Sequence, residues 1–426
     1  MMVSKCASDN RDDLCIGVID VRRAYFYAPT KRRVFVQLPP EDYKPGDEEM
    51  CGLLQYSFHG TRDAAQSWGE EISGSMEAFG FKQGRSNPCV FHRVGKDMSA
   101  AIHGDDVICC GKRCDVEELI NKFKRKYEIK WQLMGEAADL DKQVKMLNRT
   151  PSWTALGIEW MADPRHANDI IEGLGLRGAH SVAAPCDLNE HRAKDPRREE
   201  KLDQSAATQY RSLAAKVNYL AIDRPDLKYP AMNICAAMSE PSHGDLERLK
   251  RLARYLIGHA TMAQVFRWQK RPGKVTCYSD SDRAGDKTTR RSTSAGVIMF
   301  GTHTLKTWSK KQQVVALSSC EAELYAGTKC AAEGIGIQSL CRDLGMECKV
   351  EVLLDSTAAL ALGQRQGLGK AKHIQIQDLW LQEGVRERKF GLSKVASERN
   401  LADLGTKGLT PEVIARHLRG LGYQTL

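Results

Sequence analysis

The last third of the chain has the pattern that most restricts its fold, because strands come first and strands and helices then alternate. "VTCYSDSD" reads as a strand with an acidic end, and "SAGVIMFGTHTLKTWS" reads as two more strands. A helix from about Ser319, the strand "KVEVLLD", further helices and the strand "FGLSKVA" follow. This order is typical of an α/β domain, and residues 273–410 give that domain an ordinary size.

Four acidic residues stand at element ends in this segment. Asp280 ends a strand, Glu323 lies in the first turns of a helix, Asp355 ends the next strand and Asp403 opens the last helix. If these side chains converge, their like charges raise their pKa values unless a divalent cation neutralises them. A hard cation such as Mg²⁺ prefers oxygen ligands, and two such ions can clamp the oxygens of a phosphodiester during displacement.

Each of these acids also has an ordinary structural explanation. Asp280, Asp282 and Asp286 fit turns, and Glu321 and Glu323 fit the first turn of a helix, where the helix dipole favours an acid. Taken singly, the structural explanation is the better one. The joint order of strand acid, helix acid, strand-end acid and helix-start acid favours a phosphodiesterase site.

A second acidic pair lies near residue 105, between two apolar runs. In "AAIHGDDVICC", Asp105 and Asp106 separate segments that each read as a buried strand. Gly and Asp are ordinary turn residues, so a solvated hairpin tip explains the pair. The alternative is a functional site in which a positive charge lies beside the two carboxylates, because burying an unpaired charge is costly.

Residues 206–268 have a helical pattern, clearest in "DLERLKRLARYLIGH". Its apolar face consists of Leu246, Leu249, Ala253 and Leu256. The rest of its surface is basic, with Arg248, Lys250, Arg251 and Arg254. A core-packing helix with a solvated face and a helix that follows a phosphate backbone fit this pattern equally well.

Composition narrows the partners and the compartment. The formal net charge of +9 over 426 residues favours a polyanionic partner. The 14 cysteines show no paired zinc-ligand spacing and fit reduced thiols inside a cell. No apolar run is long enough for a signal peptide or a membrane span, so we expect an intracellular protein, cytoplasmic or nuclear, that is not secreted and has no membrane partner.

Two breaks divide the chain. Residues 134–153 look like a loop or insertion, and residues 186–205 are charged and nearly free of apolar side chains. We therefore expect a mixed α and β chain with a first unit at 1–160 and a mostly helical unit at 161–272 that contains the charged linker 186–205. The α/β domain at 273–410 and a C-terminal tail at 411–426 follow.

The α/β segment closely resembles the ribonuclease H domain of copia-like retrotransposon polyproteins. The match runs from "YSDSDRAGD" through "RRSTSAG", "WSKKQ" and "SSCEAE" to "LLDSTAALAL", "KHIQIQ" and "NLADLGTKGL". The resemblance assigns the catalytic acids to Asp280, Glu323, Asp355 and Asp403. It implies hydrolysis of the RNA strand of an RNA/DNA hybrid, with water as nucleophile and with two Mg²⁺ ions per site or Mn²⁺ as an alternative.

The first part of the chain resembles the reverse transcriptase of the same polyproteins. "VIDVRRAYFYAPTKRRVFVQLPP" looks like its first catalytic motif, and "IHGDD" looks like its catalytic hairpin. The resemblance implies that Asp20, Asp105 and Asp106 hold two Mg²⁺ ions at a template-primer. The intervening unit is similar to a thumb or connection that contacts the duplex backbone, which favours the phosphate-tracking interpretation of the basic helix.

The residues expected to contact nucleic acid come from the helix and from the α/β domain. They are Arg248, Arg251, Arg254, Arg290, Arg291, Lys310 and Lys311. A solvated basic surface explains the last four nearly as well. The sequence gives no indication of the oligomeric state.

The chain departs from the resembled family in three places. Only 19 residues precede Asp20, so we expect a partial reverse transcriptase palm without fingers. His103 stands where an aromatic residue is usual, and both stacking on a primer end and a structural role fit it. In the α/β domain Gln375 replaces a frequent acid, and His373 fits a structural role as well as a functional one.

These departures leave two alternatives to the nuclease. One is a nucleic-acid-binding relic, or pseudogene product, without catalysis. The other is a reverse transcriptase that is active only when the missing N-terminal segment is supplied. Primer extension restored by that segment would distinguish the second from the first.

Overall fold

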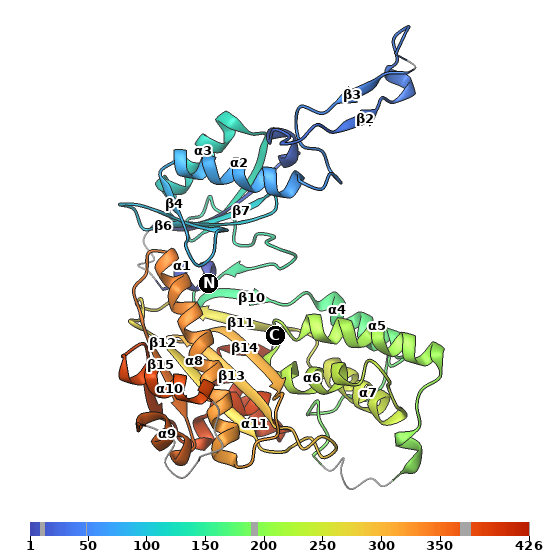
Figure 1. Cartoon of the computed structure of the whole chain (residues 1–426), viewed down its shortest axis with the longest axis vertical. Coiled ribbons are helices and arrows are strands. Elements are labelled where there is room, and N and C mark those ends of the chain that lie inside the picture. The colour runs from blue at the N-terminus through green and yellow to red at the C-terminus, as the bar shows by residue number, and fades with distance from the viewer. Residues whose placement is uncertain (9–12, 48, 189–194, 367–375, 426) are drawn as a thin grey trace.

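The computed structural model describes residues 1–425 except 9–12, 48, 189–194 and 367–375. The chain forms a mixed α/β structure, as the sequence predicts, with three neighbouring parts (Figure 1). A palm-like unit lies at one end, and a second α/β unit and a group of helices lie side by side at the other.

The first unit has a six-stranded sheet in the order β4-β5-β6-β7-β1-β8. The strands are β4 (Phe81–Gln83), β5 (Val90–Arg93), β6 (Met98–His103), β7 (Asp106–Lys112), β1 (Leu14–Val21) and β8 (Ile129–Gly135). Alternate residues of β1 face opposite sides: Cys15 and Ile19 join the core beneath the helices α2 (Ala64–Ala78) and α3 (Arg113–Lys126), whereas Ile16 faces α1 (Met2–Cys6).

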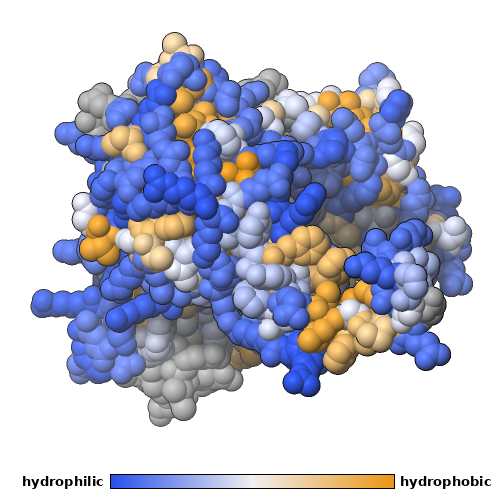
Figure 2. Space-filling model, turned by 90° about the horizontal axis from the view of Figure 1, so that it is seen from above, coloured by the Kyte–Doolittle hydropathy of each residue, from blue (hydrophilic) through white to orange (hydrophobic). Residues whose placement is uncertain are grey.

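A separate two-stranded ribbon extends from this unit (Figure 1). It consists of β2 (Phe35–Gln37) and β3 (Cys51–Leu53), with the short 3₁₀ helices η1 (Ala24–Tyr27) and η2 (Pro40–Asp42) beside it in the chain. Several apolar side chains here are exposed, among them Phe35, Tyr56 and Phe58. Seen from above, apolar patches interrupt a mostly hydrophilic surface (Figure 2).

The middle of the chain is mostly helical, as predicted. Its helices are α4 (Pro164–Gly173), η4 (Pro196–Glu199), α5 (Gln204–Leu220), η5 (Pro225–Leu227), α6 (Lys228–Ala236) and α7 (His243–Gly258). The predicted apolar face of α7 is buried at Leu249, Ala253 and Leu256. A fully buried ion pair between Arg224 and Asp226, with the Tyr255 hydroxyl donating to Asp226, ties η5 to α7.

A second sheet joins the middle of the chain to its C-terminus. It contains β9 (Ser152–Trp153), β10 (Gly157–Met161), β11 (Met262–Arg267) and β17 (Tyr423–Thr425), in the order β17-β11-β10-β9. The segment expected as a C-terminal tail instead folds into α11 (Pro411–Gly420) and the edge strand β17. Amphipathic α11 buries Ile414 and Leu418 in the adjoining core, which holds the end of the chain in place.

The second α/β unit has a five-stranded sheet in the order β14-β13-β12-β15-β16. The strands are β14 (His303–Lys311), β13 (Thr293–Phe300), β12 (Lys274–Asp282), β15 (Lys349–Leu354) and β16 (Gly391–Lys394). Its helices are α8 (Ser319–Asp343), α9 (Thr357–Gln364), α10 (Ile376–Arg386), η6 (Ser397–Arg399) and η7 (Leu401–Gly405). The first three strands are antiparallel and β15 and β16 are parallel, so the strand ends that carry the predicted acids meet at one edge.

Polar contacts join the two α/β units. The buried ammonium group of Lys5 lies 2.9 Å from Asp97 and donates to the Ser99 hydroxyl and to the Leu344 carbonyl oxygen, at 2.7 and 3.0 Å. The Asp343 carboxylate at the end of α8 accepts backbone N–H groups from Arg85 and its two successors, at 2.9 to 3.0 Å. Such hydrogen bonds to a charged group are stronger than neutral ones.

Within the described part of the chain, none of the helices combines the length and apolar character that crossing a membrane requires.

Candidate active sites

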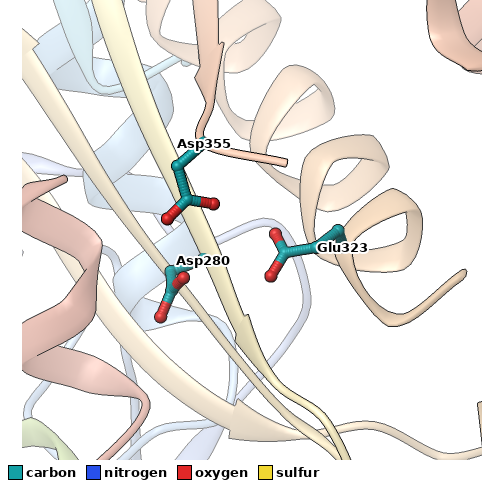
Figure 3. A group of neighbouring side chains, drawn as sticks. All are labelled: Asp280, Glu323 and Asp355. Carbon is teal, nitrogen blue, oxygen red and sulfur yellow. The ribbon is translucent and has the colours of Figure 1, made fainter. Parts of the chain in front are cut away.

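Strand register brings the first and third predicted acids together. Strands β12 and β15 are parallel, with Tyr278 opposite Leu353. Asp280 and Asp355 each lie two residues further along, so both reach the same edge of the sheet. Figure 3 shows the two aspartates one above the other, with Glu323 projecting toward them from α8. One oxygen from each of the three side chains lies within 4.8 Å of the others.

The start of α8 separates the roles of its two glutamates. The Ser318 hydroxyl accepts the Glu321 N–H at 3.1 Å, and the Glu321 carboxylate accepts the Leu317 N–H at 2.7 Å, so Glu321 caps the helix. Glu323 instead faces β12, where its carboxylate accepts the Ser281 N–H at 3.1 Å. The first-turn explanation therefore fits Glu321 but not Glu323. Likewise Asp286 is a turn residue, since it accepts the N–H groups of the next loop.

The fourth acid lies on η7, a 3₁₀ turn where the sequence predicts the start of a longer helix. Asn400 fixes this turn, because its side chain donates to the Ser279 carbonyl oxygen at 2.9 Å and accepts the Ala402 N–H at 3.3 Å. A Cβ atom on Gly405 would lie 2.7 Å from that of Ala295, so only glycine allows η7 to lie this close to β13. Asp403 thereby reaches the carboxyl group of Asp280.

Burial and repulsion raise the pKa values of Glu323 and Asp280. Glu323 is 7% exposed, and its burial together with the charges of Asp280 and Asp355 raises its pKa to about 9. Burial and the neighbouring Asp403 also raise the pKa of Asp280, although the Thr406 hydroxyl donates to its carboxylate. Without a cation, the group therefore holds its negative charge at a cost.

The residues present fit a divalent metal ion. Three carboxylates supply oxygen donors from rigid elements, which is the ligand type that Mg²⁺ prefers. One oxygen of Glu323, Oε2, is buried without a hydrogen-bond partner, which is costly unless a cation contacts it.

The predicted palm acids also meet. Asp20 on β1 is directly opposite Asp106 on β7, and Asp105 lies in the two-residue turn that precedes β7. The Val21 N–H donates to the Asp105 carbonyl oxygen at 3.1 Å, which fixes the hairpin tip against the end of β1. Partial burial and the charges of Asp105 and Asp20 raise the pKa of Asp106, with His103 opposing them.

The acidic group of the palm, Asp20, Asp105 and Asp106, is more exposed to solvent than the group of Asp280, Glu323 and Asp355. Asp105 and His103 are exposed, and Asp20 and Asp106 are partly exposed. Asp20 and Asp106 line a shallow cavity of about 550 Å³ together with Lys130. The turn explanation is thus correct for this hairpin, and the turn places Asp105 next to the paired residues Asp20 and Asp106.

The predicted nucleic-acid contacts divide into two sets. Arg248, Arg251, Arg290 and Lys311 line one cavity of about 930 Å³ between the helices α6 and α7 and the loop that joins β12 to β13. Arg198, Lys287 and Lys407 add further positive charge to it. Its acidic lining residues are Asp187, Asp245, Glu247, Asp282 and Asp286. Ion pairs join Arg248 to Asp245 and Lys311 to Asp286.

The other three residues lie outside the lining of this cavity. Arg254 donates to the His180 carbonyl oxygen at 2.8 Å and holds the chain against α7, which is a structural role. Arg291 and Lys310 are exposed. His373, whose role the sequence left open, lies outside the described residues.

Sequence reasoning missed three residues that shape the acidic group. They are Asn400, Thr406 and Lys407, which contact Ser279, Asp280 and Asp403 respectively. All three flank Asp403 in "NLADLGTK", so the signal was their proximity to a predicted acid.

Comparisons with known proteins agree with this arrangement. A family profile described as "Reverse transcriptase (RNA-dependent DNA polymerase)" matches residues 5–187. The chain is 24% identical over 413 residues to a retrovirus-related Pol polyprotein from transposon TNT 1-94 of Nicotiana tabacum. It is also 24% identical over 408 residues to that from transposon RE1 of Arabidopsis thaliana.

Each match covers 93% of this chain but only 30% and 26% of the relative. The chain therefore spans less than a third of the length of these polyproteins. Among solved structures, a foamy viral protease-reverse transcriptase in complex with an RNA/DNA hybrid matches 93% of this chain and 46% of its own, with a TM-score of 0.54 and 9% identity. That likeness concerns the fold alone.

Proposed function

Since the chain belongs to the copia-like family of retrotransposon Pol polyproteins, we propose that its second α/β unit is a ribonuclease H part, which hydrolyses the RNA strand of RNA/DNA hybrids. The observation that carries the proposal is the convergent group of two buried acids, Asp280 and Glu323, with the partly buried Asp355, and the contact of Asp403 with Asp280. Buried carboxylates without a compensating charge are costly, so a group of this kind fits a cation-dependent site.

Asp280, Glu323, Asp355 and Asp403 would hold the cations. Two Mg²⁺ ions, or Mn²⁺ in their place, would supply the charge that activates water and stabilises the leaving oxygen of a phosphodiester. The protein's own contribution is position: Asn400 and Thr406 fix Asp403 and Asp280, and the capping of α8 by Glu321 directs Glu323 inward.

The cavity beside these acids supports binding of a nucleic-acid backbone. Lys407 lines it together with Arg290 and Arg248, so the basic surface continues up to the acidic group. Contacts to phosphates position a duplex without reading its sequence. Selection of the RNA strand would then depend on its 2′-hydroxyl groups.

Cleavage of a labelled RNA/DNA hybrid by the purified protein tests the proposal. We expect cutting with Mg²⁺ and none with a chelator, and Asp280→Asn and Asp355→Asn should each abolish it. If folded protein binds the hybrid but does not cut it under any metal condition, the chain is a non-catalytic nucleic-acid binder and the proposal is wrong.

Nucleotide addition at the palm is a second candidate function, favoured by the pairing of Asp20 with Asp106 beside Asp105. The test is primer extension on a template-primer by this chain, alone and with a supplied fingers segment. Extension that needs Asp106 would support the function. Extension only after the segment is added would support a polymerase that is completed by a further part.

A further inference from the structure

One positive charge lies inside the acidic group of the ribonuclease H part. The Lys407 ammonium group is 3.0 Å from Asp403 Oδ1, one helical turn before it in the chain. Thr406, which directly precedes Lys407 in the chain, donates its hydroxyl to Asp280. Two consecutive side chains therefore engage two of the acids, Asp280 on β12 and Asp403 on η7.

This ion pair explains an asymmetry among the four acids. Asp280, Glu323 and Asp355 converge within 4.8 Å, but Asp403 is not part of that convergent set. Its carboxylate contacts both Asp280 and the lysine. The charges of Asp280 and Asp355 also act on Lys407: burial lowers its pKa, but these acids and Asp403 raise it above its ordinary value, so the ammonium group stays charged.

We propose that Lys407 is an internal counter-ion that occupies the place of a second divalent cation at Asp403 and is displaced when that cation binds. The inference rests on the function proposed above, since it concerns the same site. It makes Lys407 a positioning residue, which acts through Asp403. One cation would then bind readily to the three convergent acids, and a second only in competition with the lysine.

The structure gives the displaced ammonium group a place to go. The Lys407 side chain is 47% exposed and has a long flexible stem, so it can turn without moving the backbone. It lines the cavity of about 930 Å³, as does Asp282, two residues beyond Asp280 on β12. The positive charge of Lys407 already acts on Asp282, so this carboxylate is a second partner within its reach.

Binding of Mn²⁺ tests the proposal independently of cleavage. The full chain, carrying Asp105→Asn and Asp106→Asn to silence the palm acids, is titrated with Mn²⁺ while the free ion is followed by electron paramagnetic resonance. The variants are Lys407→Gln, Lys407→Arg and Lys349→Gln. Lys349 is an exposed lysine at the opposite end of β15 from Asp355, so it matches the charge change away from the site.

We expect the parent to bind one Mn²⁺ tightly and a second weakly. Lys407→Gln should bind the second ion about tenfold more tightly, because a positive charge about 3 Å from a ligand is removed. Lys407→Arg and Lys349→Gln should behave like the parent. Unchanged or weaker second binding in Lys407→Gln would overturn the proposal and leave the lysine a structural role.

A second variant covers the case in which Lys407→Gln does not fold. Asp403→Asn removes the carboxylate that the lysine holds, and it should keep the first ion and lose the second. Loss of both ions, or of neither, contradicts the proposal. If the parent binds two ions as described but cuts no hybrid, the proposed function fails while the inference about Lys407 stands.

Discussion

The chain contains two groups of acids, and they differ in burial and in what surrounds them. In the palm, Asp105 is exposed and Asp20 and Asp106 are partly exposed on a hairpin and its neighbouring strand. In the second α/β unit, Asp280 and Glu323 are 4% and 7% exposed. Solvent screens the first group, whereas the Lys407 ammonium group and the Thr406 hydroxyl compensate part of the charge of the second.

This difference has a consequence for function. The buried group is already assembled by elements of a single unit, because strand register, a helix cap and a glycine contact position its four acids. The palm group has its acids on β1 and at the β6–β7 turn, and part of its surroundings is open. We therefore expect the first to act on its substrate as it stands and the second to depend on further contacts.

The largest expected effect is on hybrid cleavage, which should depend on one group of acids and not on the other. Asp355→Asn should lower Mg²⁺-dependent hybrid cleavage by more than about 100-fold, since even outer-shell partners of metal ligands are worth about 10- to 100-fold. Asp106→Asn should leave cleavage within about twofold, because it lies in the other group. Initial rates on a labelled hybrid measure both, and equal losses in the two variants would refute the separation.

The next effect concerns stability and pH. Glu323 keeps its proton up to about pH 9 in the folded protein, whereas an unfolded glutamate releases its proton near pH 4.5. In the presence of chelator, the contribution of Glu323 to the stability of the fold is therefore full at low pH and is lost as the pH rises toward 9. Glu323→Gln removes this loss. Its unfolding temperature should exceed that of the parent by roughly 5 °C at pH 9 and by much less at pH 5.5.

Circular dichroism melts at both pH values measure this difference, with Glu347→Gln as a control at an exposed position. A difference that is the same at both pH values would show that Glu323 does not carry the raised pKa. Added Mg²⁺ should stabilise the parent but not the variant, which loses cleavage as well.

One glycine near each acidic group can be replaced by alanine, and the loss of stability then shows how tightly the backbone is packed there. Gly405→Ala should destabilise by about 1–3 kcal/mol, because its Cβ would meet Ala295 at 2.7 Å and push η7, with Asp403, off the sheet. Gly104→Ala should cost about 1 kcal/mol, because its φ of 64° is left-handed but nothing lies within 4 Å of the new Cβ. Urea unfolding gives both values. Cleavage should fall only in the first variant.

The smallest expected effect is on binding. Arg290→Gln and Arg248→Gln should each weaken hybrid binding by a few-fold and reduce the salt dependence of binding by about one charge, as expected for a phosphate contact. Lys349→Gln, outside the cavity, is the matched control. Fluorescence anisotropy at several salt concentrations measures this, and a loss that does not depend on salt would argue against backbone contacts.

Most of the fold followed from local pattern. The alternation in β1, the apolar face of α7 and the strand-helix order after residue 273 each depend on neighbours along the chain, so the sequence determines them. The acids at the ends of those elements were predicted for the same reason. Parallel strands bring their ends to one edge, and the register of β12 with β15 does so for Asp280 and Asp355.

Contacts between segments that are distant in the chain were decided only by the tertiary structure. The segment 411–426 looked like a tail because a short amphipathic helix and a three-residue strand have little signal of their own; they are stabilised by packing and by pairing with β11. The cavity assembles basic residues that are more than 200 positions apart, from Arg198 to Lys407, which no local pattern reveals.

The same holds for the acidic group itself. By itself the sequence determined the residue types, their order along the chain and their family. Only the fold decided that Glu321 caps a helix while Glu323 enters the site, and that Lys407 pairs with Asp403 beside the three convergent acids. The physical reason is that charge, burial and pKa depend on which groups lie within a few ångströms in space, and chain neighbourhood specifies only some of these.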